Sequence, residues 1–582
     1  MKSNFTTCEI TDSEANASTK NKSQTIIGTE LVTFRNKEEM RLVGFHDYPV
    51  GIPGTDKWMI VLPGYGETKT EVLAESYFLA KNGLHTLRFD YSYHVGESDG
   101  DILHTTLERM KDDILSSIGY LHHRFSPKKI GAVASSLASR ALLRAAREDH
   151  RIQLLLNLVS VVDLRKTLFA IYQEDYLQRA KNGLPVGIMD VLGFQVDADS
   201  FLRSAIANHY EDLKTTLEDM RYIDAPVVFF AAAKDAWVEL DDVWQAIYAV
   251  SGKRMDLQIL EDSMHELHEN PAVSRKALSG IVHYATLFLL GEDRLDHITQ
   301  PNLREIGFRV RKEKKRNKIL HETSKEEERE FWKSYLDKYS FVVNVPDYWD
   351  LMNLVYLLLG EIRPQERILD AGCGIGNFGM FLLVKLLYAA KKQPIFPGWY
   401  QSLRYVGLDF VQEALLQARH SHDDIEKEFV QTRDLAGNGR LLIGSYFLAD
   451  LEALLPFKEN TFDKLCCNLV ISYVRSPAET ISEMVKLLKP GGRIVVTSLK
   501  PFADLSQVYR NFIKVAKNKA HLAEAQKLLS NAGRIKAKEA QGIYRFFSEE
   551  ALTDLLKEAG VCEVETYRSL GNQANVAVGV KA

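Results

Sequence analysis

The chain has 582 residues, which is too long for one ordinary hydrophobic core and predicts at least two large domains. Hydrophobic residues make up 46% and charged residues 26%, as in soluble globular proteins. A formal net charge of −5 gives no reason to expect a nucleic-acid partner. No apolar run reaches the roughly 18 residues that cross a bilayer, so we expect no stable membrane insertion.

The five cysteines have no metal-ligand spacing, and the adjacent Cys466 and Cys467 make a poor disulfide pair. This pattern favours reduced thiols in the cytoplasm and no metal centre. Residues 1–25 are rich in Ser, Thr, Asn and Lys and lack an apolar stretch. They are therefore interpreted as a disordered lead and not as a signal peptide.

Two series of alternating strand and helix patterns follow, with a charged segment between them. The first series, 58–290, is typical of a mostly parallel sheet. Residues 309–330 are almost wholly charged, which favours a solvated connector helix, although a basic run of this kind can also dock on an acidic partner. We therefore predict an α/β domain at 26–308, a charged helical linker at 309–344 and a second α/β domain at 345–582.

Ser136 follows the apolar segment 130–134 after one further serine, in the position of a nucleophile after a buried strand. The usual Gly-x-Ser-x-Gly is replaced by small alanines at 134 and 138, so the motif is weak when taken alone. A strand pattern that ends at Asp235 and a later one followed by His265 complete the chain order Ser, Asp, His of α/β-hydrolases.

In that arrangement His265 takes the proton of Ser136, and Asp235 orients the imidazole and stabilises its charged form. The backbone N–H of Leu137 and one from the turn around Tyr65 would receive the developing oxyanion. A core serine, a helix-capping aspartate and a surface histidine are the alternatives. Nearby competitors for the two partner roles are His268, Asp241 and Asp242.

Several segments of this half resemble the acyl-transferases of bacterial bioluminescence, which release fatty acid from acyl carrier protein. The matching segments, within about residues 27–320, are 87–100, 134–140, 159–168, 234–238 and 263–270. The resemblance implies an α/β-hydrolase fold and favours Ser136, Asp235 and His265 over their neighbours. It also implies a long-chain acyl thioester substrate, on acyl carrier protein or coenzyme A.

Residues 163–220 lie between two predicted strands and are largely helical, with apolar residues throughout. In this fold such an insertion forms a cap over the serine. An apolar cap suits an acyl tunnel, although packing onto the sheet explains most of these residues equally well.

The second series begins with a strand, a glycine-rich turn and a helix start at 367–379, where glycines let the backbone approach a ligand. Asp409 ends the next strand, where an acid can bind two ribose hydroxyls, and Asp450 follows a further strand. These motifs resemble class I methyltransferases that use S-adenosylmethionine, over about residues 345–582, and imply a Rossmann-like fold. The implied cofactor-binding residues are Asp370, Gly372, Cys373, Gly374, Gly376, Asn377, Asp409, Phe410, Asp450, Leu451 and Asn468.

Two features depart from the simplest pattern of that family. The interval from Asp370 to Asp409 exceeds the roughly 20 residues expected, which predicts a surface insertion at 383–404. Residues 502–542 form a long basic helical insertion, where this fold often places a substrate lid. That segment could meet an acidic carrier protein or a pantetheine phosphate, or present an ordinary solvated helix face.

The two halves together predict a bifunctional enzyme. The first domain would take an acyl group onto Ser136 and hydrolyse or transfer it, and the second would methylate the released acid or the bound chain. The alternatives are an esterase for small esters, or a non-catalytic acyl-binding module, fused to a methyltransferase that acts on an unrelated small molecule. No feature indicates an oligomeric state.

Overall fold

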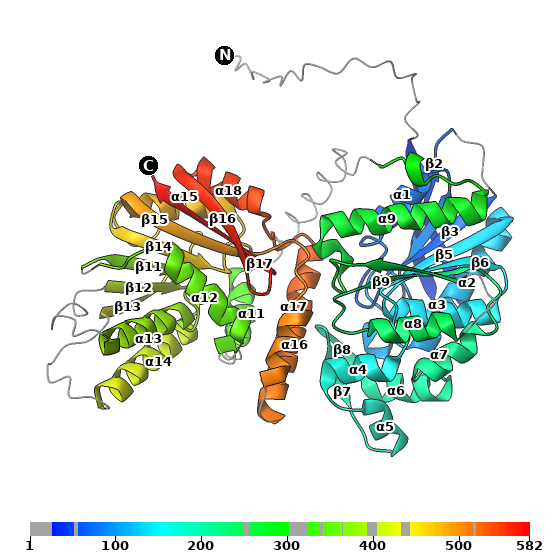
Figure 1. The fold of residues 1–582 in the computed structure, drawn as a ribbon, viewed down its shortest axis with the longest axis horizontal. Helices are drawn as coiled ribbons and strands as arrows, with labels where there is room; N and C mark the ends of the chain where they lie inside the picture. The colour runs from blue at the N-terminus through cyan, green and yellow to red at the C-terminus, as the bar shows by residue number, and fades with distance from the viewer. Residues whose placement is uncertain are drawn as a thin grey trace, which may run out of the picture.

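The computed structural model of the protein describes residues 26–51, 56–249, 255–301, 324–336, 342–343, 345–363, 365–392, 404–431, 443–515 and 519–582. Two α/β domains lie side by side, and the helices α16 (Ser506–Val515) and α17 (Lys519–Ala540) stand between them (Figure 1). The predicted lead at 1–25 and most of the predicted linker lie outside the described residues.

The N-terminal domain is built on an eight-stranded sheet in the order β1-β2-β4-β3-β5-β6-β9-β10. The strands β1 and β2 are antiparallel, and the other six run parallel to one another. This order confirms the predicted α/β-hydrolase fold. The strand bounds are β1 (Ile27–Arg35), β2 (Arg41–Pro49), β3 (Lys57–Leu62), β4 (His85–Phe89), β5 (Lys129–Ser135), β6 (Ile152–Leu158), β9 (Val227–Ala232) and β10 (Met255–Leu260).

Helices cover both faces of this sheet, so its central strands are apolar throughout and do not alternate. Phe229 and Phe230 illustrate this arrangement, because neighbours in β9 point to opposite faces and belong to different core clusters. One face carries α1 (Leu73–Lys81) and α9 (Pro271–Ala285). The other carries α2 (Leu107–Phe125), α3 (Leu137–Glu148) and α8 (Leu240–Tyr248).

The segment between β6 and β9 forms the predicted helical cap. It contains α4 (Leu164–Tyr172), α5 (Tyr176–Lys181), α6 (Ala198–Ala207) and α7 (Leu213–Met220), each begun by an aspartate that accepts a backbone N–H of the first turn. A short hairpin of β7 (Ile188–Val191) and β8 (Phe194–Asp197) was not predicted. Its two-residue turn, 192–193, has positive φ at both positions, as a tight hairpin requires.

The C-terminal domain has a seven-stranded sheet in the order β13-β12-β11-β14-β15-β17-β16. The strands up to β15 are parallel, and β17 is antiparallel to both of its neighbours. This topology confirms the predicted Rossmann-like fold. The strands are β11 (Arg367–Ala371), β12 (Arg404–Asp409), β13 (Ile443–Leu448), β14 (Phe462–Asn468), β15 (Leu488–Leu499), β16 (Val561–Ser569) and β17 (Ala574–Lys581).

Helices flank this second sheet on both sides (Figure 1). They are α12 (Pro346–Leu358), α13 (Asn377–Lys392), α14 (Gln412–Gln431), α15 (Pro477–Leu487) and α18 (Glu549–Glu558). Of the predicted insertion at 383–404, residues up to 392 extend α13, and 393–403 lie outside the described residues. None of the described helices is long and apolar enough to cross a membrane.

The described part of the predicted linker includes a helix, α11 (Lys325–Leu336). Its charged residues match the predicted connector, but one face carries Trp332 and Leu336, which pack against the C-terminal domain. The solvated connector was predicted for 309–330, and the apolar stripe lies beyond it, where aromatic and aliphatic residues are spaced three and four apart.

Candidate active sites

Ser136 lies at the C-terminal end of β5 in a strained backbone conformation. Its φ and ψ are 53° and −123°, a combination that costs on the order of 1–3 kcal/mol for a residue with a side chain. The alanines at 134 and 138 are buried on either side, and the N–H of Ser136 donates to the carbonyl of Leu158 at 2.9 Å. The sharp turn between strand and helix brings the serine to the wall of a cavity.

The structure brings Ser136, His265 and Asp235 together from the ends of β5, β10 and β9. Ser136 Oγ lies 2.8 Å from His265 Nε2, and His265 Nδ1 lies 2.8 Å from Asp235 Oδ2. Asp235 Oδ1 accepts the backbone N–H of Trp237 at 2.8 Å and of Val238 at 3.1 Å. These bonds hold the carboxylate in place, so it can fix the orientation of the imidazole.

The electrostatic surroundings of His265 favour its charged form. Burial lowers the pKa of the ring, but the charge of Asp235 and the hydrogen bond to it outweigh burial, so the pKa of His265 is raised above 6.5. Asp504 and Glu266 act in the same direction. Because Asp504 belongs to the C-terminal domain, both domains set the basicity of this histidine.

The competing residues make other contacts. His268 bonds through Nδ1 to Glu266 at 3.0 Å, and despite burial this bond and the nearby charge of Glu75 raise the pKa of His268 to about 9. A histidine that is charged at neutral pH cannot accept the proton of a serine. Asp242 pairs with a lysine at 2.6 Å, and Asp241 is exposed in the first turn of α8.

Two backbone N–H groups beside the serine are available to donate a hydrogen bond to a ligand. Gly64 and Gly66 already donate their N–H groups to neighbouring side chains, at 2.8 and 3.2 Å. Among the described residues, no hydrogen bond takes the N–H of Tyr65 or of Leu137, and both residues line the cavity with Ser136. Their position is that of the two donors predicted for an oxyanion.

The cavity over Ser136 extends beneath the cap and is mainly apolar. Helix α4, the β7–β8 hairpin and helix α6 supply much of its wall, and Tyr172 and Tyr176 border it as well. Such a cavity suits the aliphatic part of a ligand, with polar groups confined to the end that carries the serine. Representative apolar wall residues are Leu164, Leu168, Ile171, Val191, Val196 and Phe201.

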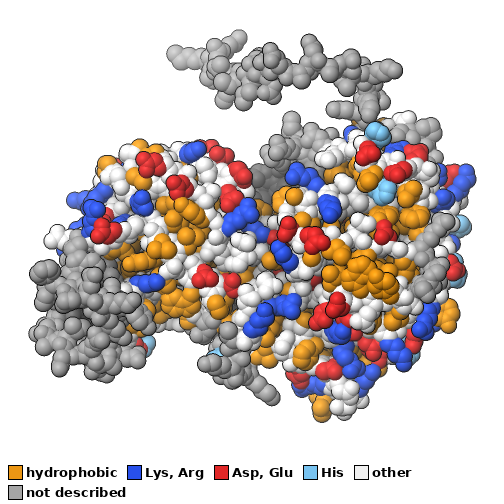
Figure 2. Space-filling model, in the orientation of Figure 1, with side chains coloured by type: hydrophobic (Ala, Val, Ile, Leu, Met, Phe, Trp, Pro, Cys, Tyr) orange, Lys and Arg blue, Asp and Glu red, His pale blue; other side chains and the backbone are white. Residues whose placement is uncertain are grey.

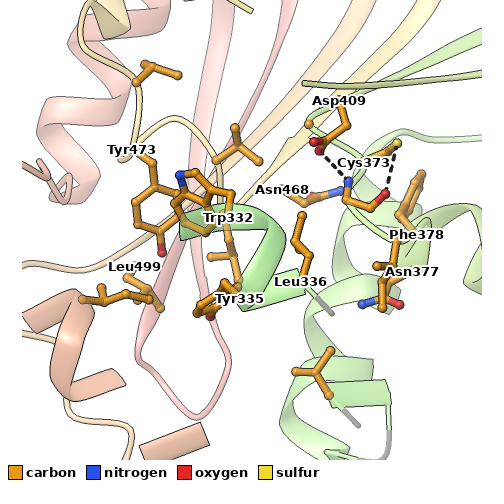
Figure 3. Close-up of a pocket in the computed structure, with 18 of the residues that line it drawn as sticks. Trp332, Tyr335, Leu336, Cys373, Asn377, Phe378, Asp409, Asn468, Tyr473 and Leu499 are labelled. Carbon is orange, nitrogen blue, oxygen red and sulfur yellow. Dashed lines mark hydrogen bonds between the residues drawn. The ribbon is translucent and has the colours of Figure 1, made fainter. Parts of the chain in front are cut away.

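A second cavity lies at the carboxyl ends of the parallel strands of the C-terminal sheet, around the glycine-rich turn (Figure 3). Gly372, Gly374 and Gly376 have φ of 77°, 52° and 81°. A Cβ on Gly372 would lie 2.6 Å from a valine methyl group, so the close packing of the turn requires glycine. The predicted residues line this cavity, except Gly376, which instead packs against α14.

Asp409 links the end of β12 to the glycine-rich turn. Its carboxylate accepts the N–H of Gly374 at 2.8 Å and that of Val411 at 2.9 Å. Burial nevertheless raises the pKa of Asp409 to about 6. Burial also raises the pKa of Asp370 to about 6, although Asp370 accepts a hydrogen bond from the hydroxyl of Tyr405 at 2.7 Å. Two such carboxyls gain stability when a ligand supplies further hydrogen-bond donors.

Two buried amides carry unpartnered polar atoms at this cavity. Within the described part of the chain, Nδ2 and Oδ1 of Asn468 and Oδ1 of Asn377 have no hydrogen-bond partner. A buried polar atom without a partner costs about 1–3 kcal/mol, so a polar ligand would relieve this cost. These atoms, the acid at 409 and the tight glycine turn fit a nucleoside cofactor such as S-adenosylmethionine.

Further along the cavity, Asp450 accepts the N–H of Glu452 at 2.9 Å and pairs with Lys325 of α11 at 3.1 Å. Phe410 and Leu451 add apolar surface beside it. A planar base would therefore meet apolar side chains flanked by a charged pair.

Sequence reasoning missed the contribution of α11 to this cavity. Trp332, Tyr335 and Leu336 form part of its wall, and the ring of Trp332 lies 4.7 Å from that of Tyr473, centroid to centroid (Figure 3). The spacing of these three residues was the available signal, but the surrounding charges obscured it. The described residues contain no group of three or more His, Cys, Asp or Glu side chains that could hold a metal ion.

The predicted basic insertion packs directly on the loops that carry Asp235 and His265. The guanidinium of Arg510 donates to the carbonyl of Asp235 at 3.3 Å, and the N–H of Glu266 donates to Asp504 at 3.1 Å. The hydroxyl of Tyr509 bonds to the carbonyl of Ile171 in the cap. The interpretation of this insertion as a solvated helix face is wrong for these contacts, since they bind it to the other domain.

Comparisons with known proteins agree with the division of the chain into two domains. Residues 54–319 match the acyl transferase family, and residues 349–565 match a methyltransferase domain family. An acyl transferase of Photorhabdus laumondii subsp. laumondii is 31% identical over 244 residues, which are 42% of this chain and 78% of the relative. One from Shewanella hanedai is 30% identical over 268 residues, covering 45% and 85%.

Among solved structures, an esterase of Pyrococcus furiosus is similar with a TM-score of 0.34 and 18% identity, over 45% of this chain and 94% of the esterase. The sheet topologies and the two family matches together describe an α/β-hydrolase-like domain joined to a Rossmann-like domain that matches a methyltransferase family. Through its N-terminal half the chain belongs to the acyl transferase family.

Proposed function

We propose that the protein is a bifunctional enzyme that cleaves a fatty acyl thioester at Ser136 and methylates the released acid with S-adenosylmethionine. The observation that carries the proposal is the hydrogen-bonded series from Ser136 through His265 to Asp235 at the end of an apolar cavity. The acyl donor is acyl carrier protein or acyl-coenzyme A. The reaction takes place in the cytoplasm, where the four described cysteines stay as thiols.

In the first step His265 accepts the proton of Ser136 while Oγ attacks the thioester carbonyl. The N–H groups of Tyr65 and Leu137 bind the oxyanion, and the thiolate leaves with the proton from the imidazole. Water activated by the same histidine then attacks the acyl-serine, and Ser136 recovers its proton. The products are a free thiol and a long-chain acid, which ionises at neutral pH.

The second site needs no general base for this acceptor, because a carboxylate is already deprotonated. When bound, S-adenosylmethionine would supply an electrophilic methyl group to the carboxylate oxygen, and its sulfur would keep the electron pair and become a neutral thioether. The chain's own contribution is to bind the cofactor and the acid and to orient them. The residues at 370, 409, 468 and 377 would hold the cofactor's polar groups, and the α11 aromatics would exclude water.

The test uses purified full-length protein, dodecanoyl-coenzyme A and methyl-labelled S-adenosylmethionine. Free thiol release together with labelled methyl dodecanoate supports both steps. Ser136→Ala should abolish thiol release and labelling by a fluorophosphonate, whereas Ser135→Ala, the neighbouring hydroxyl, should retain both. Thiol release that persists in Ser136→Ala would refute the serine mechanism.

The same assay separates the substrate classes. Turnover of p-nitrophenyl acetate without turnover of acyl thioesters of any length would favour an esterase for small esters. Thiol release without a labelled ester would confine the proposal to the first domain.

Figure 2 shows Lys and Arg side chains interspersed with Asp and Glu over both domains, so a carrier protein would meet a surface of mixed charge on this face.

A further inference from the structure

One side chain is common to the walls of both cavities. Lys536, on α17, lines the cavity that holds Ser136 and also the cavity around the glycine-rich turn. It shares the wall of the methyltransferase cavity with Ile535 and Ala532 of the same helix, and the wall of the hydrolase cavity with Leu267. The two active-site cavities therefore meet at this lysine.

The ammonium group of Lys536 pairs with Glu266, the residue that follows His265 in the chain. Burial acts to lower the pKa of Lys536, but the charges of Glu266 and Glu67 outweigh it and raise the pKa, so the group stays charged. The lysine side chain is still 45% exposed, against 12% for Glu266. Part of the lysine side chain is therefore left uncovered by protein, and the residue borders both cavities.

Carboxyl groups surround this cation from several elements. Glu67 follows the Tyr65 turn, Asp504 precedes α16, and Glu266 lies on the loop after β10. The imidazole of His268, also on that loop, bonds to Glu266. Glu539 lies one turn further along α17 and lines the methyltransferase cavity. An incoming carboxylate would compete with Glu266 for the lysine and would be repelled by the other acids, so it would be held briefly.

We propose that the two cavities form one internal passage, and that Lys536 binds the carboxylate of the acyl product as it moves from Ser136 to the methyltransferase site. This inference rests on the proposed function and deepens it, because it names the group that guides the product. No bond forms or breaks in this step. The carboxylate replaces Glu266 as the partner of the ammonium, and Glu266 regains the lysine when the product moves on.

The first test measures binding alone, in full-length protein without cofactor. The probes are dodecanoic acid and methyl dodecanoate, and their Kd values are determined by calorimetry. Lys536→Gln should weaken binding of the acid about 10-fold, since a charge-assisted hydrogen bond is lost. It should change binding of the ester by less than about 2-fold. Lys536→Arg should retain acid binding, and Lys527→Gln, an exposed lysine on the same helix, should behave as wild type.

A lysine that only stabilises Glu266 predicts a different pattern. In our proposal Glu266→Gln frees the ammonium and strengthens binding of dodecanoic acid, whereas Lys536→Gln weakens it. If the lysine were merely structural, both variants would alter binding of acid and ester alike and in the same direction. That result would overturn the proposal. Circular dichroism and melting temperatures of each variant would identify any that fails to fold. If Lys536→Gln fails, Glu266→Gln against wild type gives the comparison, because stronger binding of the acid with unchanged binding of the ester supports the proposal and an equal change in both contradicts it.

The second test follows passage directly. Wild-type protein receives unlabelled dodecanoyl-coenzyme A and S-adenosylmethionine together with an excess of deuterated dodecanoic acid. Internal passage gives methyl ester that is mostly unlabelled, and Lys536→Gln raises both the deuterated fraction and the ratio of free acid to ester. Ester that carries the full deuterium content of the bulk acid would refute the passage while leaving both activities intact. Free acid with no ester from either source would refute the proposed methylation, and the passage with it.

Discussion

The carbonyl oxygen of Leu192, in the cap, occupies the space that a side chain on Gly533 of α17 would need. A Cβ built on Gly533 would lie 1.8 Å from this oxygen. Immediately beside this contact, Arg534 pairs with Asp190 of the hairpin at 2.7 Å. The two domains therefore touch backbone to backbone at this point, and only glycine permits so close an approach.

Gly533→Ala should weaken the docking of α17 on the cap by about 1–3 kcal/mol, because the added methyl group forces the backbones apart. Limited proteolysis within α17 and the melting temperature would report this change. The matched control is Gly119→Ala in α2, where a Cβ would meet nothing within 4 Å. That substitution should stabilise the protein by about 0.5–1 kcal/mol. Equal behaviour of the two variants would show that the domains do not dock in this way.

The pH dependence of acylation should reflect His265. Because Asp235 outweighs burial and raises the pKa of His265 above 6.5, the neutral imidazole is lost as the pH falls through that raised value. The rate of Ser136 acylation should therefore decline toward acid with a midpoint above 6.5. Stopped-flow acylation at different pH values measures this midpoint.

Asp235→Asn should shift that midpoint toward lower pH, because the charge that stabilises the imidazolium is removed. It should also slow acylation by about 10⁴-fold, as expected for loss of the acid of a triad. Asp241→Asn, an exposed aspartate in the first turn of α8, serves as the control and should change neither quantity. A wild-type midpoint below 6.5 would contradict the role of Asp235.

Cofactor affinity should fall in mild acid. The pKa values of Asp409 and Asp370 are both about 6 in the cofactor-free protein, since burial raises them. Carboxylates that accept hydrogen bonds from a ligand must be ionised, so binding of S-adenosylmethionine should weaken as the pH falls from 7.5 to 5. Calorimetry without a methyl acceptor measures this directly. Asp409→Asn should bind more weakly and with a shallower pH dependence, whereas Asp424→Asn, on the exposed part of α14, should match wild type.

Asn468→Ala provides a test at the same cavity that does not depend on pH. Both polar atoms of this amide are buried and unpartnered among the described residues. If they bind the cofactor, their removal should weaken affinity about 10-fold. The free protein should lose little stability, because no hydrogen bond within the described structure is broken. A large loss of stability with unchanged affinity would exclude this role.

The cap should set acyl length. Leu168 of α4 lines the apolar cavity over Ser136, and Leu168→Trp would fill part of it. Thiol release from long-chain acyl-coenzyme A should then fall by at least about 10-fold relative to a short-chain donor, as overpacking costs about 1–3 kcal/mol. An unchanged chain-length profile would show that the acyl chain lies elsewhere.

The order of the strands, and the site residues that follow directly after them, could be predicted well from the sequence. The sequence shows strand patterns in the order in which the strands occur. A serine follows one of them, and an acid and a histidine follow two later ones. This information was enough to predict that Ser136, Asp235 and His265 come together. The reason is that parallel strands end at the same edge of a sheet, so chain order translates into spatial proximity. The glycine-rich turn and Asp409 follow the same logic.

Contacts between elements that are distant in the chain could not be predicted in this way. The apolar and basic pattern of α17 is the same whether its partner is water, its own domain or the cap, so Gly533 and Lys536 carried no visible signal. The stripe on α11 was hidden by the surrounding charges. Gly376 was assigned to the cofactor because it belongs to the motif, but its carbonyl accepts a hydrogen bond from His422 at 2.8 Å and serves the packing of α14.

If the acyl product passes between the two cavities, as we propose, their meeting at Lys536 has a consequence for flux. A product confined beside the second site has an effective concentration on the order of millimolar, whatever its concentration in bulk. The methyltransferase would then work near saturation on an acid that hardly accumulates outside the protein. Long-chain acids are detergents that disturb membranes and bind other proteins, so neutralising each molecule before it escapes would protect the cell that makes it.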